Sequence, residues 1–190
     1  MEIKPHYFWA VRLPDSIKQY IQDEMTNVKQ IFKFKRWVHM DDYHITLVFL
    51  GSVDQQKTQS VIDLVGDAIK DEKAFELQIE GLNVFGNNIS PRIFWGAVNH
   101  ETKLHQLQAV VHKKCQEAGF TLENRPYHPH ITLARNWTGN EEFDRGLLQK
   151  HNPFYEEALS FQANEIVLYK SNLEKTPKYE PVATFSLLDE

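Results

Sequence analysis

The chain has little of several features that define other classes of protein. Its one cysteine, Cys115, excludes an intrachain disulfide and a cysteine-rich zinc module, and is typical of a reducing compartment. Eight glycines and eight prolines in 190 residues are too few for a flexible linker protein. No apolar run approaches the ~20 residues that cross a bilayer. The residues from Met1 to His6 have neither the basic start nor the apolar stretch of a signal peptide. We therefore expect a soluble cytoplasmic protein.

The chain also lacks an excess of positive charge. Its 21 Lys and Arg residues against 26 Asp and Glu give a net charge of −5, which argues against broad coating of duplex nucleic acid but leaves room for a local phosphate site. The hydrophobic fraction of 42% and the charged fraction of 25% are ordinary for a globular protein. The unusual feature of the composition is its nine histidines.

An internal repeat divides the sequence. Three segments recur 86 residues later: Phe8-Trp9 as Phe94-Trp95, His44-Ile45-Thr46-Leu47 as His130-Ile131-Thr132-Leu133, and Phe75 as Phe161. Three matches at one spacing indicate two related halves, residues 1–88 and 89–190 approximately. Because no linker rich in Gly, Ser or Pro separates the halves, we predict a single two-lobed domain over residues 1–190.

Hydrophobic periodicity gives each half the same order of elements, which is strand, helix, strand, helix, strand. The expected strands are 7–13, 43–51, 75–84, 93–98, 129–133, 165–169 and 179–187, and the expected helices are 15–28, 61–69, 104–119 and 143–148. Helices of this periodicity need a sheet face to cover. We therefore predict an α+β chain of two lobes related by an approximate two-fold axis. Each lobe is expected to be a mostly antiparallel sheet covered by two helices, and the lobes are expected to face each other.

Each half carries a His-x-Thr motif on a predicted strand. Side chains two residues apart in a strand point to the same face, so His44 and Thr46 are expected to project together. Ile45, Leu47 and Phe49 are expected on the opposite face. Taken alone, such a motif is more often a core histidine whose polar atoms have partners. Finding it twice at one offset needs another explanation, because polar side chains on a buried strand are costly without partners.

A two-fold axis would bring the two motifs together across one central cleft. Two imidazoles with a pKa near 6.5 can hold opposite protonation states at neutral pH, so that one acts as a base and the other as an acid. In-line displacement at phosphorus needs such groups on opposite sides of the phosphate, with hydroxyl donors on the non-bridging oxygens. The duplicated motif therefore predicts phosphodiester chemistry that needs neither a metal nor a covalent nucleophile.

With these motifs the sequence resembles the two-histidine phosphoesterase superfamily, whose signature is a pair of His-x-Thr-x motifs. Within it, the likeness is to the LigT-like RNA 2′,3′-cyclic phosphodiesterases, formerly called 2′-5′ RNA ligases. The likeness continues in order through residues 8–14, 36–38, 47–51, 125–130 and 165–171. It implies a bilobal LigT-like fold with the active site in the central cleft. It also implies hydrolysis of RNA 2′,3′-cyclic phosphate ends to 2′-phosphomonoesters without a cofactor.

The resemblance also implies a role for each site residue. His44 matches the proton donor, His130 the proton acceptor, and Thr46 and Thr132 the hydroxyls that contact the phosphate. Arg135 matches a common arginine after the second motif, but it lies five residues beyond His130. Strict alternation would turn its side chain to the opposite face, so contact with the phosphate requires a bulge or the end of the strand. The implied partner is RNA with a 2′,3′-cyclic phosphate end or a cyclic nucleotide, with no membrane and no obligate protein partner, and we expect a monomer.

Three alternatives stay open at this stage. By microscopic reversibility the same histidines serve both directions of the reaction, so a 2′-5′ RNA ligase or a 2′-5′ oligonucleotide phosphodiesterase of the same superfamily fits the motifs too. A module that only binds RNA ends is the second alternative, although binding does not require two groups that titrate near neutrality. A metallohydrolase is the third, but no Asp, Glu or Cys near His128 and His130 completes a ligand set, so no metal is expected.

A basic stretch interleaved with aromatic residues lies between Val28 and Met40, where no acidic residue occurs. Its members are Lys29, Phe32, Lys33, Phe34, Lys35, Arg36 and Trp37. One interpretation is a rim that attracts an RNA backbone and stacks a base. The other is a strand with buried aromatic side chains and solvated lysines.

Overall fold

The computed structural model describes residues 5–189, except for the side chains of Gln55 and Gln56. The segment before Pro5, in which no signal peptide is expected, lies outside the described residues. The elements in chain order are β1 (His6–Arg12), α1 (Asp15–Ile31), β2 (Phe34–Trp37), the 3-10 helix η1 (Met40–Asp42), β3 (His44–Ser52), α2 (Gln55–Ile69), β4 (Phe75–Gly86), β5 (Pro91–Val98), α3 (Thr102–Glu117), β6 (His130–Trp137), α4 (Arg145–Lys150), β7 (Leu159–Ala163), β8 (Glu165–Ser171) and β9 (Tyr179–Ser186).

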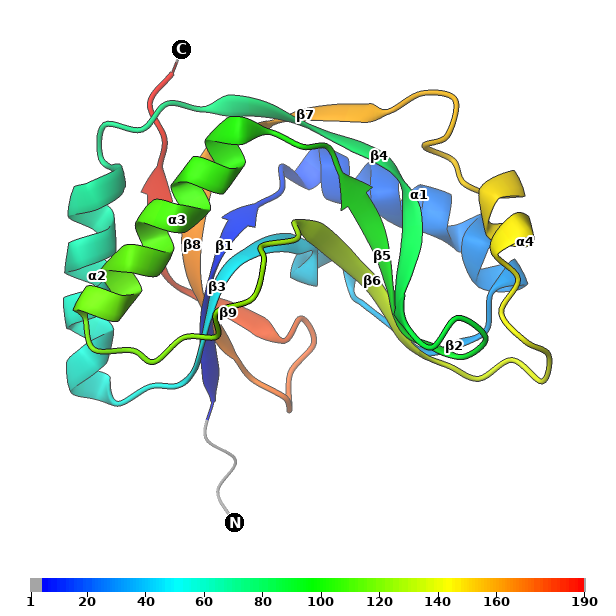
Figure 1. Cartoon of the computed structure of the whole chain (residues 1–190), viewed down its shortest axis with the longest axis horizontal. Coiled ribbons are helices and arrows are strands. Elements are labelled where there is room, and N and C mark those ends of the chain that lie inside the picture. The colour runs from blue at the N-terminus through cyan, green and yellow to red at the C-terminus, as the bar shows by residue number, and fades with distance from the viewer. Residues whose placement is uncertain (1–4, 190) are drawn as a thin grey trace.

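The described strands pair in the order β7-β4-β5-β6-β3-β1-β8-β9, with β2 on β6, and each of these pairings is antiparallel. The two lobes meet at β3 and β6, which pair through Ile45 and Ile131. The first lobe contains β1, β3, β8 and β9, and the second contains β2, β4, β5, β6 and β7. In Figure 1, α2 and α3 lie on one side of the molecule, over the first lobe, and α1 and α4 lie with the second lobe. The predicted α+β class is confirmed.

Each lobe takes strands from both halves of the sequence. β8 and β9, at the end of the chain, extend the sheet from β1. β4, from the first half, pairs with β5 and β7 of the second half. The lobes are therefore interleaved along the chain. The division into halves 1–88 and 89–190 stays a prediction, and the matching antiparallel pairs β1–β3 and β5–β6 are consistent with it.

The helices form where the apolar periodicity predicts them, with some shifts at their ends. α1 buries Ile21, Met25 and Val28, which lie three and four residues apart on one face. α3 buries Leu104, Leu107, Val111 and Cys115, and burial raises the pKa of the Cys115 thiol to about 12. The expected helix at 143–148 begins later, at Arg145, because the Asp144 carboxylate accepts hydrogen bonds from the backbone N–H groups of Gly146 and Leu147.

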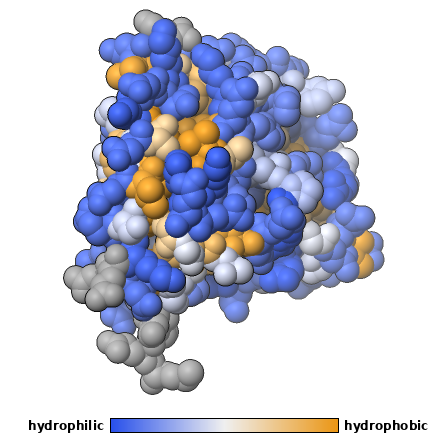
Figure 2. All heavy atoms as spheres, turned by 60° about the vertical axis from the view of Figure 1, so that its left-hand side comes forward, coloured by the Kyte–Doolittle hydropathy of each residue, from blue (hydrophilic) through white to orange (hydrophobic). Residues whose placement is uncertain are grey.

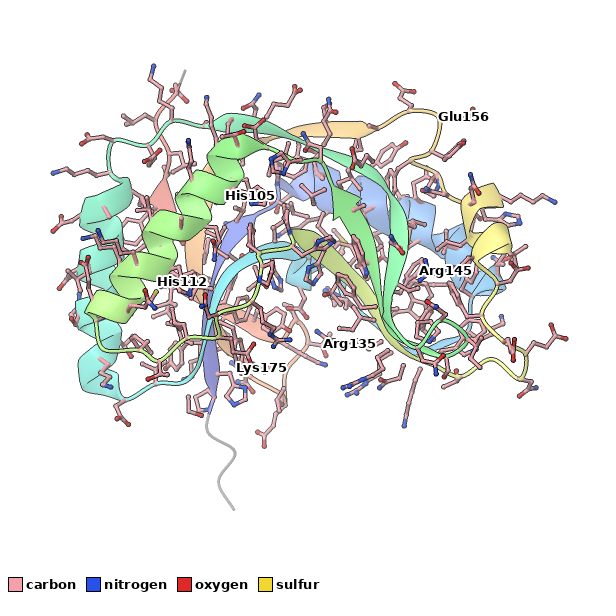
Figure 3. All side chains as sticks on the ribbon, in the orientation of Figure 1. His105, His112, Arg135, Arg145, Glu156 and Lys175 are labelled. Atoms are coloured by element: carbon pink, nitrogen blue, oxygen red, sulfur yellow. The ribbon has the colours of Figure 1, made fainter. Side chains whose placement is uncertain are left out.

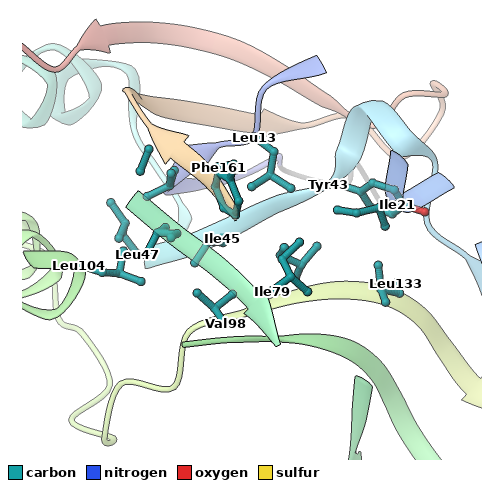
Figure 4. Packing of buried hydrophobic residues seen from close by; sticks show 14 of the residues in the cluster. Leu13, Ile21, Tyr43, Ile45, Leu47, Ile79, Val98, Leu104, Leu133 and Phe161 are labelled. Carbon is teal, nitrogen blue, oxygen red and sulfur yellow. The ribbon is translucent and has the colours of Figure 1, made fainter. Parts of the chain in front are cut away.

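One continuous core lies between the sheet and its helices. Ile45 and Leu47 of β3 and Leu133 of β6 join the same buried cluster as Ile21 of α1 and Leu104 of α3 (Figure 4). On the outside, the side of the molecule that carries α2 and α3 is mainly hydrophilic, with a patch of hydrophobic atoms visible between polar side chains (Figure 2). Among the described residues, no helix combines the length and apolar character needed to cross a membrane. Because the apolar residues of the two motifs pack into this core, the histidines and threonines of the motifs lie on the other face of the sheet.

Candidate active site

A cleft of about 730 Å³ lies where the two lobes meet. The five polar residues predicted for the site, His44, Thr46, His130, Thr132 and Arg135, all line it. The His-x-Thr pairs come from β3 and β6, which are adjacent in the sheet. The structure therefore brings both motifs to one cleft, as the duplicated sequence predicts.

The imidazole of His44 is fixed by two hydrogen bonds. Its Nδ1 atom lies 2.7 Å from the carbonyl oxygen of Asp42, and its Nε2 atom lies 3.0 Å from the hydroxyl oxygen of Thr46. A carbonyl only accepts, so Nδ1 carries the proton and Nε2 of the neutral ring accepts from the threonine hydroxyl. Phe8 packs on the ring at 4.8 Å between centroids and Tyr179 meets it edge-on at 5.2 Å. Nδ1 of His44 is therefore bonded to the backbone, whereas Nε2 is bonded to a side chain of the same motif.

His130 is held in the same way in the second lobe. Its Nδ1 atom lies 2.8 Å from the carbonyl oxygen of His128, again two residues earlier in the chain. Rings of the second lobe pack against it, with centroid distances of 5.1 Å to Phe85 and 5.8 Å to Trp95. Both imidazoles thus direct Nδ1 toward the backbone carbonyl two residues earlier in the chain.

A β-bulge follows each motif and decides which later side chains reach the cleft. In β6, Phe94 and Trp95 of β5 pair with Ala134 and Thr132, so Leu133 is an extra residue. The bulge turns Arg135 to the same face as Thr132, and Arg135 is exposed and lines the cleft. The bulge that the contact of Arg135 with a phosphate requires is therefore present.

β3 contains the same bulge, which changes the face predicted for Phe49. Trp9 and Ala10 of β1 pair with Val48 and Thr46, so Leu47 is the extra residue. The prediction that Phe49 lies on the face opposite His44 is wrong. Its side chain is 57% exposed and lines the same cleft as His44. Since Phe49 and Arg135 are also 86 residues apart, the two lobes present an aromatic ring and a guanidinium at equivalent positions. The cleft is therefore asymmetric.

Burial in the cleft lowers the pKa of both histidines. The pKa of His44 falls to about 4, mainly because desolvation penalises the charged ring, and the nearby positive charges of His130 and Arg135 lower it further. The Asp42 carbonyl acts in the opposite direction. Desolvation also lowers the pKa of His130, with smaller contributions from His128 and Arg135. At neutral pH both imidazoles of the free protein are therefore uncharged, and an anion in the cleft would favour protonation of either one.

Asp42 also lines the cleft, although no sequence motif marks it. Its carboxylate is buried, 4% exposed, and accepts hydrogen bonds from the backbone N–H groups of Lys178 and Tyr179 at 2.9 to 3.0 Å. Asp42 therefore links the turn before His44 to the start of β9, where Tyr179 packs on the same imidazole. Position 128, which is equivalent by the repeat, holds an exposed histidine.

The basic stretch divides between the two interpretations. Phe34 of β2 is buried, as expected for a strand with buried aromatic residues, whereas Phe32 is buried at the end of α1. Lys35, Arg36 and Trp37 line the cleft, as the alternative expects of a rim.

In Figure 3, Arg135 lies on the lower side of the ribbon as drawn, as does Lys175 of the loop between β8 and β9, whereas His105 and His112 lie along α3. Within residues 5–189, no group of three or more His, Cys, Asp or Glu side chains is arranged to hold a metal ion.

Comparison with known proteins identifies the family. The family model described as the 2′-5′ RNA ligase superfamily matches residues 14–174. A Bacillus subtilis (strain 168) protein named RNA 2′,3′-cyclic phosphodiesterase is 34% identical over 186 residues, which cover 98% of each chain. A Geobacillus stearothermophilus protein of the same name is 40% identical over 185 residues, which are 97% of this chain and 58% of that protein. The chain thus spans little more than half the length of this second relative.

Solved structures share the fold. Escherichia coli LigT complexed with 3′-AMP is 25% identical with a TM-score of 0.76, and the match covers 97% of this chain and 99% of that one. A Thermus thermophilus protein, 23% identical and covered to the same extent, gives a TM-score of 0.79. The predicted LigT-like fold is therefore confirmed. By its family model, its relatives and its fold, the chain belongs to the 2′-5′ RNA ligase superfamily.

Proposed function

We propose that this chain hydrolyses the 2′,3′-cyclic phosphate end of RNA to a 2′-phosphomonoester, with His130 as the general base and His44 as the general acid. The observation that carries the proposal is the pair of imidazoles in one cleft, each with Nδ1 held by a backbone carbonyl and Nε2 left for proton transfer. Relatives named RNA 2′,3′-cyclic phosphodiesterase support this activity. The assignment of acid and base follows the resemblance of the two motifs to those of the family.

We propose one displacement at phosphorus, assisted by both histidines. Nε2 of His130 takes a proton from a water molecule, whose oxygen attacks the phosphorus. The bond from phosphorus to O3′ breaks, and Nε2 of protonated His44 gives its proton to O3′. The product carries a 2′-phosphate and a 3′-hydroxyl. Each proton transfer of this kind contributes ~10²- to 10⁴-fold to the rate.

The remaining polar groups of the cleft suit the phosphate. The Arg135 guanidinium and the hydroxyls of Thr46 and Thr132 would donate to its non-bridging oxygens. In the free protein the Thr46 hydroxyl donates to Nε2 of His44, so the bound phosphate competes for that hydrogen. The negative charge of the phosphate would also raise the depressed pKa of His44 and so promote its protonation.

The product of one reaction tests this proposal. An oligoribonucleotide with a 2′,3′-cyclic phosphate end is incubated with the protein and followed by ³¹P NMR. We expect the cyclic-phosphate signal to give way to that of a 2′-phosphomonoester, with and without EDTA. An unchanged substrate would contradict the proposal. Joining to a 5′-hydroxyl RNA would favour the ligase alternative, and loss of activity in EDTA would favour a metallohydrolase.

We also propose that the two lobes work as one unit, because neither lobe alone contains both histidines. The chain is proposed to act as a monomer in the cytoplasm, on RNA or on a cyclic nucleotide. Light scattering after size-exclusion chromatography measures the oligomeric state, and a dimer would contradict the monomer. Fractionation of cells that carry an epitope-tagged chain tests the location.

A further inference from the structure

A second pair of cations lies beside the proposed catalytic residues. Arg36 of β2 stands directly opposite Arg135 of β6 in the antiparallel ladder, and Lys35 is its neighbour in the chain. Both β2 side chains, Lys35 and Arg36, are exposed and line the cleft. We call these two residues the β2 cations. The proposed hydrolysis of the cyclic phosphate uses Arg135 and leaves the β2 cations without a role.

The positive charge at this place is not compensated by the protein. Like charges on directly opposite cross-strand residues destabilise a sheet, and Arg36 and Arg135 form such a pair. Within residues 5–189, neither they nor Lys35 form an ion pair with a carboxylate. Of the residues that line the cleft, Asp42 is the acidic one, and its carboxylate is taken up by the backbone of Lys178 and Tyr179. A bound anion would relieve this repulsion.

The surroundings of the β2 cations suit a nucleic acid. Trp37, next to Arg36, also lines the cleft, and the Nζ atom of Lys29 lies over its ring at 5.3 Å. Basic side chains beside an aromatic ring are typical of sites for single-stranded nucleic acid. On the side of β9, Lys178 also lines the cleft, and its backbone N–H donates to the Asp42 carboxylate. What distinguishes the β2 cations is their place beside Arg135 and the aromatic ring of Trp37 next to them.

The β2 cations lie beside the strand that carries two of the proposed site residues. Neighbouring strands lie ~4.8 Å apart, so Arg36 lies one strand away from β6, the strand that carries both His130 and Arg135. Resting on the proposed function, we propose that Lys35 and Arg36 bind the phosphodiester that joins the terminal nucleotide to the preceding one. The preferred substrate is therefore an RNA oligonucleotide rather than a free cyclic mononucleotide.

The test compares two substrates that differ by this phosphate and the adenosine attached to it. Adenosine 2′,3′-cyclic phosphate lacks it, and the dinucleotide ApA with a 2′,3′-cyclic phosphate end contains it. We expect kcat/KM of the unchanged protein to be at least ~10-fold higher for the dinucleotide, as a charged hydrogen bond provides. Arg36→Gln should lower kcat/KM for the dinucleotide ~10-fold and leave the mononucleotide within about 2-fold. It should also lower the slope of log kcat/KM against log salt by ~0.7.

Lys113→Gln, which removes the same charge from an exposed position on α3, is the matched control and should change neither substrate. Circular dichroism confirms that each variant folds. If the dinucleotide has no advantage while the mononucleotide is hydrolysed, the second phosphate site is overturned and the proposed function stands. An equal loss on both substrates in Arg36→Gln overturns it too, because Arg36 would then act on the cyclic phosphate. If neither substrate is hydrolysed, the proposed function fails and this site fails with it.

Discussion

The Nδ1 atom of His44 lies 2.7 Å from the carbonyl oxygen of Asp42, while the Asp42 carboxylate accepts hydrogen bonds from the backbone N–H groups of Lys178 and Tyr179. One residue therefore orients the imidazole through its backbone and holds the strand that packs against the imidazole through its side chain. The second motif has the backbone half of this arrangement, because the His128 carbonyl accepts from His130. The orientation of His44 thus depends on a contact with the end of the chain.

This dependence predicts the effect of Asp42→Asn. An amide has one acceptor oxygen and a nitrogen that only donates, so part of the N–H cluster at Lys178 and Tyr179 would lose its partner. We expect the free energy of unfolding to fall by ~1 to 3 kcal/mol and kcat to fall several-fold as His44 loses its fixed orientation. Urea unfolding and initial rates measure the two effects. Asp41→Asn, at the exposed neighbouring position, is the control, and equal stability of the two variants would refute the role of Asp42.

Arg135→Gln tests the cation that the second bulge turns into the cleft. Because Arg135 is the arginine of β6 and lines the cleft, its removal should lower kcat/KM ~10- to 100-fold. The comparison variant is Arg92→Gln, on the exposed face of β5 and outside the lining of the cleft. We expect it to retain the full rate. A rate for Arg135→Gln equal to that of Arg92→Gln would exclude a contact with the phosphate.

The pH dependence of kcat/KM follows from the lowered pKa values. The reaction needs one proton on the histidine pair. Below the pKa of His44, about 4, both rings are protonated and the base is lost. Above the pKa of His130, which is lower than 6.5, both rings are neutral and the acid is lost. We therefore expect a bell-shaped profile with its maximum below pH 7. Initial rates from pH 3 to 9 measure it, and a flat profile or an alkaline maximum argues against the pair.

The same shift predicts how stability depends on pH. The unfolded chain protonates His44 near its ordinary pKa of 6.5, whereas the folded protein does so at about 4. The unfolded state therefore binds more protons between these values, and the free energy of unfolding falls as pH is lowered from 6.5 to 4. At ~1.4 kcal/mol for each unit of pKa, His44 accounts for at most ~3 kcal/mol. His44→Gln should flatten this part of a urea-unfolding series, and an unchanged slope would show that His44 does not titrate in this way.

Much of the site could be predicted because the repeat carries it. The 86-residue offset identifies His44, Thr46, His130 and Thr132, and period-two alternation is enough to place each pair on one face. Alternation fails at Phe49, because the extra residue at Leu47 reverses the later side chains. A one-residue bulge leaves no mark in the hydrophobic pattern, since Leu47 and Val48 are both apolar and both buried.

Other features depend on contacts between distant parts of the chain. The pairing of β1 with β8 joins residues about 160 positions apart, and the periodicity of single elements says nothing about which strands become neighbours. Asp42 could not be recognised for the same reason, because its partners are 136 and 137 residues away. The short strand β7 carries five residues of mixed burial and is too brief for a periodic pattern.

The rate of the double variant tests the central claim most directly. If His44 and His130 act as acid and base in one step, His44→Gln and His130→Gln should each lower kcat by ~10² to 10⁴. The double variant should then be little slower than the slower single variant, because the groups work as a unit. His112→Gln, on α3 (Figure 3), should keep the full rate. If either single variant keeps normal turnover, or if the two losses multiply in the double variant, His44 and His130 do not act together as acid and base.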